Sequence, residues 1–412
     1  MNKQKLLVFS DCYIYGGSER LMSFLVKNEV LNQKYDIKFA FRNHKIYKEG
    51  MAKDFNRQQI KLIPLTLLAN DTIFFKINSA FNHKIVGNLL KIPLLILRKI
   101  GCYSLYNAFV FLKLLAKQKP DVLHINNGGY PAAASCNLLV FIAKIKGIKR
   151  IVYQVNNQAQ KSNFLNKFRD KKLSQNVSQF ITASNMARTN LSNNVGVPLN
   201  KINIIRNIVQ LNPIQLQKIE LLKEFMLNED TFVMVNVAFL TKRKGQIHLL
   251  KAIKKWIESS EVKLDFCLFL IGDGEDLNSL VEFCAQNNLN DYVHFLGYQS
   301  NYADYIYAAD LVVFPSISNE DLPLVIIESL MLGKCILATS LAGISEVIVN
   351  NENGFLVSPD INSIEDELFK KINYLYSHSD EIDKLGKAAK ISSATFSEEI
   401  YGASLNKLYQ KC

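Results

Sequence analysis

Residues 232–250 read FVMVNVAFLTKRKGQIHLL, and they contain the repeating unit of the fold. The aliphatic run Phe232 to Val237 is followed by a short basic loop and then by a segment of helical period from about Gln246. Similar runs recur along the chain between longer helical segments, which predicts parallel strands joined by right-handed crossovers. We therefore predict the α/β class, with two Rossmann-like, doubly wound halves. The other predicted strands are Leu6–Ser10, Ile37–Phe41, Val122–Ile125, Ile151–Val155 and Phe180–Ala183 in the first half, and Asp265–Ile271, Val293–Phe295, Leu311–Phe314, Cys335–Ala338 and Gly354–Val357 in the second.

The length of 412 residues suits two domains better than one core. A polar stretch around Asn193 to Asn212, with Pro198 and Pro213, is the best candidate for the join. A C-terminal helix is expected to pack back across to the N-terminal domain. The predicted divisions are 1–205, 206–390 and 391–412, and the apolar face of the last helix is predicted to hold Ile400, Tyr401, Leu405 and Leu408.

The net charge of +12 is unevenly distributed along the chain. Residues 1–200 contain 30 Lys and Arg against 9 Asp and Glu, a balance of +21, and the remainder contains 19 against 28, a balance of minus 9. A strongly basic half favours phosphate groups, whether of a nucleic acid, a nucleotide or an anionic membrane.

The seven cysteines are scattered and form no C-x-x-C pair, which favours reduced thiols in a cytoplasmic protein over a disulfide framework or a zinc site. The apolar run Leu6 to Phe9 is too short for a signal peptide and is typical of a buried first strand. The longest apolar stretch, Ile85 to Leu115, is interrupted by Lys91, Arg98, Lys99 and Lys113, so no membrane span is expected.

Paired glycines follow the first predicted strand, in Tyr15-Gly16-Gly17-Ser18-Glu19-Arg20, and a helix is predicted from Leu21. Glycines let a backbone approach a ligand closely, and the start of a helix attracts phosphate. A purely structural turn would have the same residues. The spacing is not G-x-G-x-x-G and no P-loop lysine follows, which disfavours dinucleotide and Walker sites.

The basic loop Lys242-Arg243-Lys244-Gly245 precedes the helix from Gln246. Arg243 offers a fork of donors and Lys244 a point charge, so the pair is suited to a diphosphate. A solvated basic turn is the alternative.

The most specific segment is Ser318-Asn319-Glu320-Asp321-Leu322-Pro323-Leu324-Val325-Ile326-Ile327-Glu328. Pro323 suits the first turn of a helix, which puts Glu320 in the preceding loop and Glu328 about one and a half turns inside. A carboxylate within an apolar run is costly unless it receives hydrogen bonds, and the hydroxyls of a ribose would supply them. A capping or salt-bridging glutamate is the alternative.

This segment resembles the E-x7-E motif of retaining glycosyltransferases of the GT-B fold, and the chain looks like a family-4 glycosyltransferase, most clearly from Val235 to Pro359. The resemblance implies a GT-B fold of two Rossmann-like domains with the active site in the cleft between them. It implies that Glu320 contacts the donor sugar, that Glu328 binds the ribose, and that Lys244 and Arg243 stabilise the departing phosphate. The implied donor site further includes the backbone of Asp321, Leu322, Pro323 and Leu324, the region of Gly297 and Tyr298 beside the base, and Gly16 and Gly17 over the diphosphate.

The chain departs from the family pattern twice. Many members have Gly-Arg where this chain has Ala238 and Phe239, so that Arg243 or Lys242 would have to replace the missing arginine. Many members also have a histidine after the strand that corresponds to Ile151–Val155, where this chain has Asn156 and Asn157. The Asn156 amide can still bind a sugar hydroxyl, but it does not titrate.

The reaction implied is metal-independent transfer, with retention, of a sugar from a nucleoside diphosphate, UDP favoured, and no cofactor is required. The acceptor would be a glycan or a lipid-linked molecule, as in surface polysaccharide synthesis. The stretch from Lys76 to Lys119 combines cations, aromatic residues and the apolar run Ile92 to Leu97 with no acidic residue. It predicts either a surface that docks peripherally on an anionic membrane or core-facing helices with a solvated basic face. A sugar-nucleotide epimerase of the same fold and a catalytically silent partner protein are the alternatives, and no nucleic-acid-binding motif is present.

Overall fold

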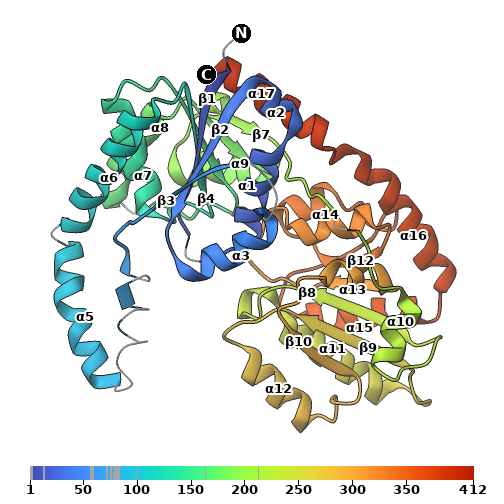
Figure 1. Cartoon of the computed structure of the whole chain (residues 1–412). Helices are drawn as coiled ribbons and strands as arrows, with labels where there is room; N and C mark the ends of the chain where they lie inside the picture. Colours follow the sequence, from blue (N-terminus) through green and yellow to red (C-terminus); the bar gives the residue numbers. More distant parts are fainter. Residues whose placement is uncertain are drawn as a thin grey trace. The chain divides into compact units, whose positions relative to one another are not determined.

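The computed structural model describes residues 3–12, 14–55, 60–70, 73–74, 77, 84–99, 101–162, 164–211 and 213–412 (Figure 1). The chain forms two compact units. Unit 1 consists of Met1–Arg206 together with Glu398–Cys412, and unit 2 consists of Asn207–Ser397. The division at 206 lies beside the predicted 205, whereas the segment that returns to unit 1 begins at 398 and not at 391.

Unit 1 is built on a parallel sheet of seven strands in the order β3-β2-β1-β4-β5-β6-β7, with helices on both faces (Figure 1). The strand order reverses between β1 and β4. The strands are β1 Gln4–Ser10, β2 Tyr35–Arg42, β3 Lys61–Leu65, β4 Val122–Asn127, β5 Arg150–Val155, β6 Gln179–Thr182 and β7 Ile202–Ile204. The helices are α1 Gly17–Lys27, α2 Glu29–Lys34, α3 Lys45–Phe55, α5 Lys84–Lys99, α6 Cys102–Gln118, α7 Ala134–Ile145, α8 Phe164–Asn176, α9 Asn185–Val195 and α17 Glu398–Lys411.

Unit 2 repeats this architecture with six parallel strands in the order β10-β9-β8-β11-β12-β13. The order reverses between β8 and β11. The strands are β8 Phe232–Val237, β9 Phe266–Ile271, β10 Val293–Gly297, β11 Leu311–Phe314, β12 Cys335–Thr339 and β13 Phe355–Val357. The helices are α10 Lys218–Glu224, α11 Gln246–Ser259, α12 Leu277–Gln286, α13 Tyr302–Ala308, α14 Leu324–Met331, α15 Ile364–Tyr376 and α16 Ser379–Ser392.

Both faces of the unit 2 sheet are buried, which explains why its strands are continuous apolar runs. Along β8, Val233 and Val235 belong to one hydrophobic cluster and Phe232 and Met234 belong to the cluster on the opposite face. Side chains alternate between the faces of a strand, so an apolar residue is needed at every position. This pattern explains why these strands could be predicted from the sequence.

Every predicted strand is present, and the described residues contain two further strands that were not predicted. The first, β3, is an edge strand that contains Pro64, a residue that weakens a strand pattern but is tolerated at a sheet edge. The second, β7, has three residues and lies inside the stretch predicted as the join. The fold class of two Rossmann-like units is confirmed.

Two helix predictions need correction. Helix α1 begins at Gly17 and not at Leu21, because the Glu19 carboxylate accepts a hydrogen bond from the Gly16 amide and starts the helix four residues earlier. In α17, Tyr401, Leu405 and Leu408 are buried as predicted, but Ile400 is 51% exposed. It lies outside the apolar stripe because the helix buries Gly402 on the side opposite to it.

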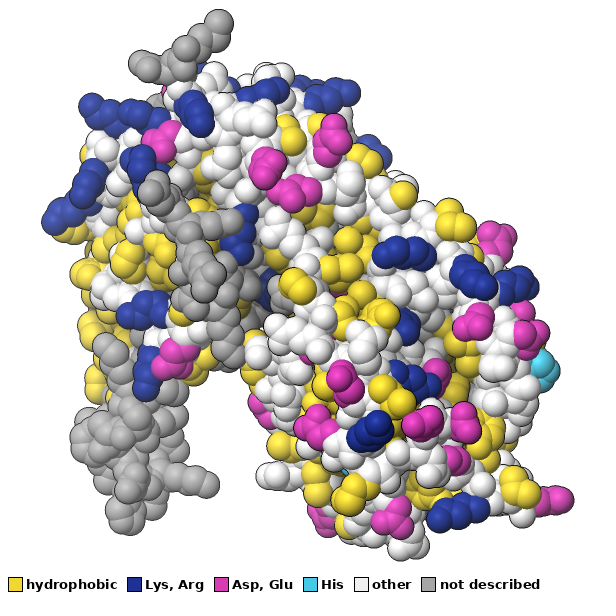
Figure 2. All heavy atoms as spheres, turned by 45° about the vertical axis from the view of Figure 1, so that its right-hand side comes forward, with side chains coloured by type: hydrophobic (Ala, Val, Ile, Leu, Met, Phe, Trp, Pro, Cys, Tyr) yellow, Lys and Arg dark blue, Asp and Glu magenta, His cyan; other side chains and the backbone are white. Residues whose placement is uncertain are grey.

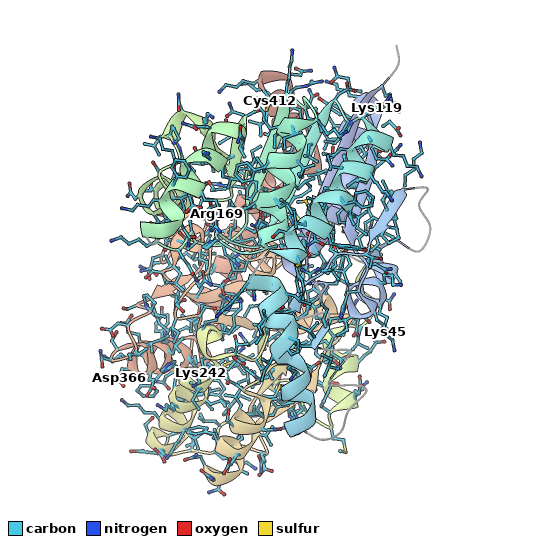
Figure 3. All side chains as sticks on the ribbon, turned by 90° about the vertical axis from the view of Figure 1, so that its left-hand side faces the viewer. Lys45, Lys119, Arg169, Lys242, Asp366 and Cys412 are labelled. Carbon is cyan, nitrogen blue, oxygen red and sulfur yellow. The ribbon has the colours of Figure 1, made fainter. Side chains whose placement is uncertain are left out.

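Helix α17 contributes to the core of unit 1. It packs against α2, where Asn28 Nδ2 donates to the Glu398 carbonyl over 2.8 Å. Figure 3 places Cys412 at the same end of unit 1 as Lys119, with Lys45 toward the opposite end. Near that end of α17, the Tyr409 ring meets Tyr35 edge to face at 5.6 Å. Unit 1 is therefore completed by the last helix of the chain.

The seven cysteines, all in the described part of the chain, are free thiols. Within the described residues, no single helix is both long enough and apolar enough to span a membrane. The helical segments 91–99 and 102–118 reach the required length and apolar character only when they are taken together, and the chain bends by 67° between them. On the face drawn in Figure 2, Lys and Arg predominate over unit 1, and both signs of charge intersperse over unit 2. This distribution matches the charge asymmetry of the sequence.

Candidate functional site

The candidate catalytic residues of unit 2 lie where its strand order reverses. The basic turn Lys242–Lys244 follows β8, and Glu320 lies in the loop after β11, the neighbouring strand. Ligands of open α/β sheets bind outside the carboxyl ends of the strands at such a switch point. The topology thus brings together two loops that are 76 residues apart.

Gly245 allows these two loops to touch. Its φ of +71° lies in the left-handed region, and a Cβ atom at this position would lie 2.0 Å from the Pro315 carbonyl oxygen. The Ile317 amide in turn donates to the Arg243 carbonyl over 2.8 Å. Any side chain at residue 245 would push the basic turn away from the loop that contains Glu320.

Two cations converge on one carboxylate oxygen. Glu320 Oε1 lies 2.5 Å from Arg243 Nη1 and 2.7 Å from Lys244 Nζ. Ser316 Oγ donates to the same oxygen over 3.5 Å. Glu320 is 5% exposed and Lys244 is 8% exposed, whereas the Arg243 side chain is about one third exposed. The predicted trio of Glu320, Lys244 and Arg243 therefore forms one ion cluster.

Burial lowers the pKa of the Lys244 ammonium, and the nearby Glu320 carboxylate opposes that shift. The Lys244 Nζ atom also lies 4.8 Å from the centre of the Phe314 ring, a favourable site for a cation. The ammonium is thus desolvated yet held by a carboxylate and an aromatic face. An anion that reached this site would interact with it strongly, because little water screens the charge.

Glu328 is the fifth residue of α14, about one and a half turns inside the helix as predicted. It is buried, and its Oε1 atom accepts a hydrogen bond of 2.5 Å from the hydroxyl of Tyr302, at the start of α13. Tyr302 could not be predicted from the sequence, because it lies 26 residues from Glu328 along the chain. The tyrosine supplies part of the hydrogen bonding that a buried carboxylate requires.

The link between Glu320 and α14 consists of Asp321, Leu322 and Pro323, and Leu324 is the first residue of the helix. Pro323 immediately precedes the helix, and Asp321, Leu322 and Leu324 are buried. Asn207, the first residue of unit 2, donates from Nδ2 to the Leu322 carbonyl over 2.8 Å. Asn207 was predicted only as part of the join, and the structure gives it the further task of holding this loop.

Gly297 and Tyr298 lie at the other side of the sheet. Gly297 ends β10, which is separated from β8 by β9, and its carbonyl accepts from the Gly272 amide over 2.8 Å. Tyr298 is 62% exposed. The structure therefore places them beyond β9 and does not join them to the Glu320 cluster.

Phe239 occupies the position where the family pattern has arginine. Its side chain is 45% exposed, and its carbonyl accepts from Gln246 Nε2 over 3.1 Å. Lys242 is exposed, whereas Arg243 contacts Glu320. Of the two cations proposed as replacements for the missing arginine, only Arg243 lies in the ion cluster.

The candidate residues of unit 1 also follow strands: Gly16 and Gly17 follow β1, at the switch point, and Asn156 follows β5, one strand beyond β4. Gly16 precedes α1, with its amide 3.3 Å from Glu19 Oε2, and Gly17 is the first residue of that helix. Asn156 follows β5, and its Nδ2 atom donates to Asn126 Oδ1, at the end of β4, over 2.6 Å. The amide of Asn156 is therefore engaged within the protein.

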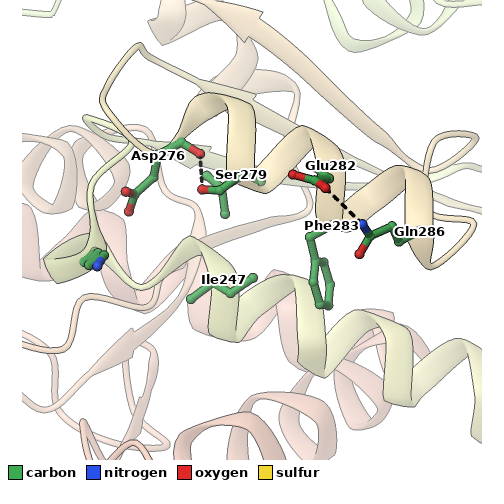
Figure 4. Close-up of a pocket in the computed structure, with 8 residues that line it drawn as sticks. Ile247, Asp276, Ser279, Glu282, Phe283 and Gln286 are labelled. Carbon is green, nitrogen blue, oxygen red and sulfur yellow. Dashed lines mark hydrogen bonds between the residues drawn. The ribbon is translucent and has the colours of Figure 1, made fainter.

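A separate groove of about 400 Å³ lies between α11 and α12 (Figure 4). Of the candidate residues, only Lys242 lines it. Two of its polar side chains bond within α12, where Ser279 Oγ donates to the Asp276 carbonyl and Gln286 Nε2 donates to Glu282 Oε1. The Glu320 cluster has the converging charges that this groove lacks. Among the residues described, no three His, Cys, Asp or Glu side chains gather as a metal site would require.

Comparison with known proteins associates both parts of the chain with one group of enzymes. Residues 217–392 match the model of the glycosyl transferases group 1, and residues 71–212 match that of glycosyltransferase family 4. The chain is 28% identical to the N-acetyl-alpha-D-glucosaminyl L-malate synthase of Bacillus anthracis over 33% of this chain and 35% of that protein. It is 33% identical to the lipopolysaccharide core biosynthesis glycosyltransferase LpsD of Rhizobium meliloti over 31% of this chain and 35% of that protein. The aligned stretches thus span about a third of these relatives.

The whole fold is shared with solved structures. HepE of Anabaena in complex with UDP superposes with a TM-score of 0.74 over 99% of this chain and 100% of HepE, at 17% identity. The same protein is also known in complex with UDP-glucose. The two family models and the shared fold together place this chain among the glycosyltransferases of the group 1 and family 4 type that have the GT-B fold.

Proposed function

We propose that this protein transfers a sugar from a nucleoside diphosphate, UDP favoured, to a glycan or lipid-linked acceptor with retention at the anomeric carbon. The observation that carries the proposal is the convergence of Arg243 and Lys244 on Glu320 at the switch point of unit 2. The UDP and UDP-glucose complexes of HepE support the donor class. The names of LpsD and related proteins support a role in polysaccharide synthesis.

In this reaction the bond between the anomeric carbon and a diphosphate oxygen breaks, and a bond to the acceptor oxygen forms on the same face. The acceptor proton passes to the leaving phosphate. Negative charge grows on the diphosphate as the bond breaks, and preformed cations in a dry site stabilise such charge most effectively. Lys244 and Arg243 perform this task, Glu320 binds hydroxyls of the donor sugar, and Glu328 binds the ribose. No metal or cofactor is needed.

Arg243 is proposed as the replacement for the arginine that the family pattern has at residue 239. Its guanidinium reaches the carboxylate that Lys244 also contacts, so both cations can face the same diphosphate. A fork of donors suits phosphate oxygens as well as it suits a carboxylate. Glu320 keeps the two cations in place until the donor arrives.

Incubation of the full chain with a panel of UDP- and GDP-sugars, with and without lipid-linked and oligosaccharide acceptors, tests the function. Acceptor-dependent release of the nucleoside diphosphate, with an anomeric configuration in the product that matches the donor, is the expected result. A free altered sugar nucleotide formed without acceptor would instead identify an epimerase. Absence of binding to every sugar nucleotide in the panel would identify a silent partner protein.

Replacing Glu328 by glutamine is expected to raise the donor KM about tenfold with little change in kcat, because a charged hydrogen-bond acceptor for the ribose is lost. Steady-state kinetics with varied donor concentration measure this split. Glu282→Gln, an exposed carboxylate on α12, is the matched control and should leave both constants unchanged. A fall in kcat with unchanged KM would contradict the assignment of Glu328 to donor binding.

Unit 1 is proposed to bind an anionic membrane through α5 and α6, where a lipid-linked acceptor would lie. Within 91–119 the side chains of Ile92, Ile96, Leu105 and Phe109 are each more than half exposed. Lys113 Nζ lies 4.2 Å from the Phe109 ring centre, a contact that joins charge to apolar surface. In Figure 1, α5 extends beyond the layer of α6 and α7. Residues 76, 78–83 and 100 and the side chains of 84–90 belong to the predicted surface but lie outside the described residues.

The full chain is expected to bind vesicles of phosphatidylglycerol and phosphatidylcholine at low salt, and not vesicles of phosphatidylcholine alone. Ile96→Glu combined with Leu105→Glu should lower the bound fraction at least about tenfold, because apolar insertion and charge attraction both weaken. Val262→Glu, at an exposed apolar residue of unit 2, is the control. Equal binding of the parent and the double variant would exclude this surface.

A further inference from the structure

A chain of hydrogen bonds, buried except at Asn156 and at Gly16, crosses unit 1 from the C-terminal helix to the turn at Gly16. It begins at Tyr409 on α17, whose hydroxyl lies 2.8 Å from His124 Nδ1, and His124 Nε2 lies 3.0 Å from Gln154 Oε1. Gln154 Nε2 then donates to Asn156 Oδ1 over 2.9 Å. The first half of the chain thus runs from α17 through β4 and β5.

The second half continues across the carboxyl ends of the strands. Asn156 Nδ2 donates to Asn126 Oδ1 over 2.6 Å, and Asn126 Nδ2 donates to Ser10 Oγ over 3.0 Å. Ser10 Oγ donates to Glu19 Oε1 over 3.4 Å. The other oxygen of Glu19 accepts from the Gly16 amide over 3.3 Å. The last link is therefore the turn for which the family resemblance implies donor binding.

The chemistry of the side chains gives every link the same direction. A carboxylate only accepts, so Ser10 must donate to Glu19 and accept from Asn126. At the other end, the Gln154 oxygen only accepts, so His124 carries its proton on Nε2 and its Nδ1 accepts from Tyr409. Donors point from Tyr409 to Glu19 throughout. Hydrogen bonds aligned in this way polarise one another.

Burial keeps the chain intact. His124, Gln154, Asn126, Ser10 and Glu19 are all less than 4% exposed. Burial lowers the pKa of His124 to about 4, so that its ring is neutral at ordinary pH, as the chain requires. Burial raises the pKa of Glu19, and hydrogen bonds from Ser18, Gly16 and Ser10 oppose that shift. Water therefore cannot readily replace a lost link at these five residues, whereas Asn156 is only half-buried.

We infer that Tyr409 and His124 are positioning residues, which hold the Gly16–Gly17 turn in place through this chain of side chains. The inference rests on the proposed function only where it links the turn to the donor. It also gives Asn156 a role other than direct donor binding, because its amide joins the two halves of the chain. The C-terminal helix thereby acts on a turn at the other end of the sequence.

The same helix supplies a matched control. Tyr401 is also on α17 and is also buried, but its hydroxyl has no hydrogen-bond partner among the described residues. Tyr401→Phe removes a buried hydroxyl from α17 without cutting the chain. Tyr409→Phe cuts the chain at its start, and Gln154→Met cuts it in the middle while keeping a side chain of similar length.

The test uses the full chain labelled with ¹⁵N at glycine. Tyr409→Phe and Gln154→Met should shift the Gly16 amide resonance and speed its hydrogen exchange roughly 3- to 10-fold, the effect of one lost hydrogen bond. Tyr401→Phe should leave it unchanged. The Gly196 amide, which donates to the Ser192 carbonyl elsewhere in unit 1, is the internal reference. A second sample of the parent, labelled with ¹⁵N at histidine, should contain a neutral histidine protonated on Nε2.

An unchanged Gly16 amide in both variants would overturn the inference. So would equal acceleration at Gly16 and Gly196, because that result indicates general destabilisation of unit 1. If the Gly16 amide responds and donor turnover falls, the inference and the proposed donor contact both stand. If the amide responds and turnover with every donor is unchanged, the chain still positions the turn, but the assignment of Gly16 and Gly17 to the donor is wrong.

Discussion

Replacing Lys244 by methionine is expected to lower kcat for sugar transfer by a factor of about 10² to 10³, the usual effect of removing one group that stabilises developing charge in a dry site. Methionine keeps an unbranched apolar side chain of similar length and removes the ammonium, which lies over the Phe314 ring. The donor KM should change less than kcat, because the charge on the leaving diphosphate is greatest in the transition state.

Lys242→Met is the matched control for charge. It removes a cation from the same turn, but Lys242 is exposed and does not contact Glu320, so kcat should stay within about twofold of the parent. Combining Lys244→Met with Glu320→Gln should cost less than the sum of the two separate losses, because the residues act as one cluster. Full activity of Lys244→Met would remove the basis for the mechanism.

The activity of the parent should also fall at alkaline pH. A lysine with a lowered pKa loses its proton at a lower pH than an ordinary lysine, so the stabilising charge disappears as the pH rises through that value. The alkaline limb of kcat/KM reports this group in the free enzyme. It should be absent from the residual activity of Lys244→Met.

Gly245→Ala is expected to lower the free energy of unfolding of unit 2 strongly, and by more than Gly297→Ala does. A left-handed backbone costs a residue with a Cβ atom about 1–2 kcal/mol, and overpacking against a fixed neighbour adds roughly 1–3 kcal/mol. Here the neighbour is the Pro315 backbone carbonyl, 2.0 Å from the added atom, which cannot rotate away. The basic turn and the Glu320 loop must separate, so transfer activity should be lost as well.

Urea unfolding followed by Trp256 fluorescence measures this prediction, because the one tryptophan of the chain is buried in unit 2. Gly297→Ala separates the two causes. Its φ of +64° is also left-handed, but the nearest atom to an added Cβ would be Asp273 Oδ1 at 3.5 Å, an ordinary contact. Equal destabilisation by the two substitutions would mean that the close approach at Gly245 contributes nothing.

The elements that the sequence predicted well are those whose signal is local. Strands such as β8 and β11 were found with their observed bounds, because burial on both faces leaves an uninterrupted apolar run. Strand β3 was missed because Pro64 breaks such a run, and β7 because three residues are too few to form a pattern. Helix α1 was predicted too short because its start depends on a side-chain contact of Glu19.

The candidate site shows the same limit. Glu320, Arg243 and Lys244 were identified from the motifs that contain them, and the structure joins them in one cluster. Tyr302 and Asn207 contact this region from other parts of the chain, and no local pattern marks them. Whether Arg243 or Lys242 would replace the missing arginine was likewise undetermined from the sequence, because the two residues are adjacent and the fold decides where the turn points each side chain.

The way the chain divides between the units bears on the order in which they can form during synthesis. Unit 2 is one continuous segment, and all of it has been made when residue 397 is added. Unit 1 must wait for α17, which supplies the partner of His124 and the packing beside Tyr35. The unit that leaves the ribosome first is therefore finished last. Released chains that end before residue 398 should contain a complete second unit and a first unit that lacks α17.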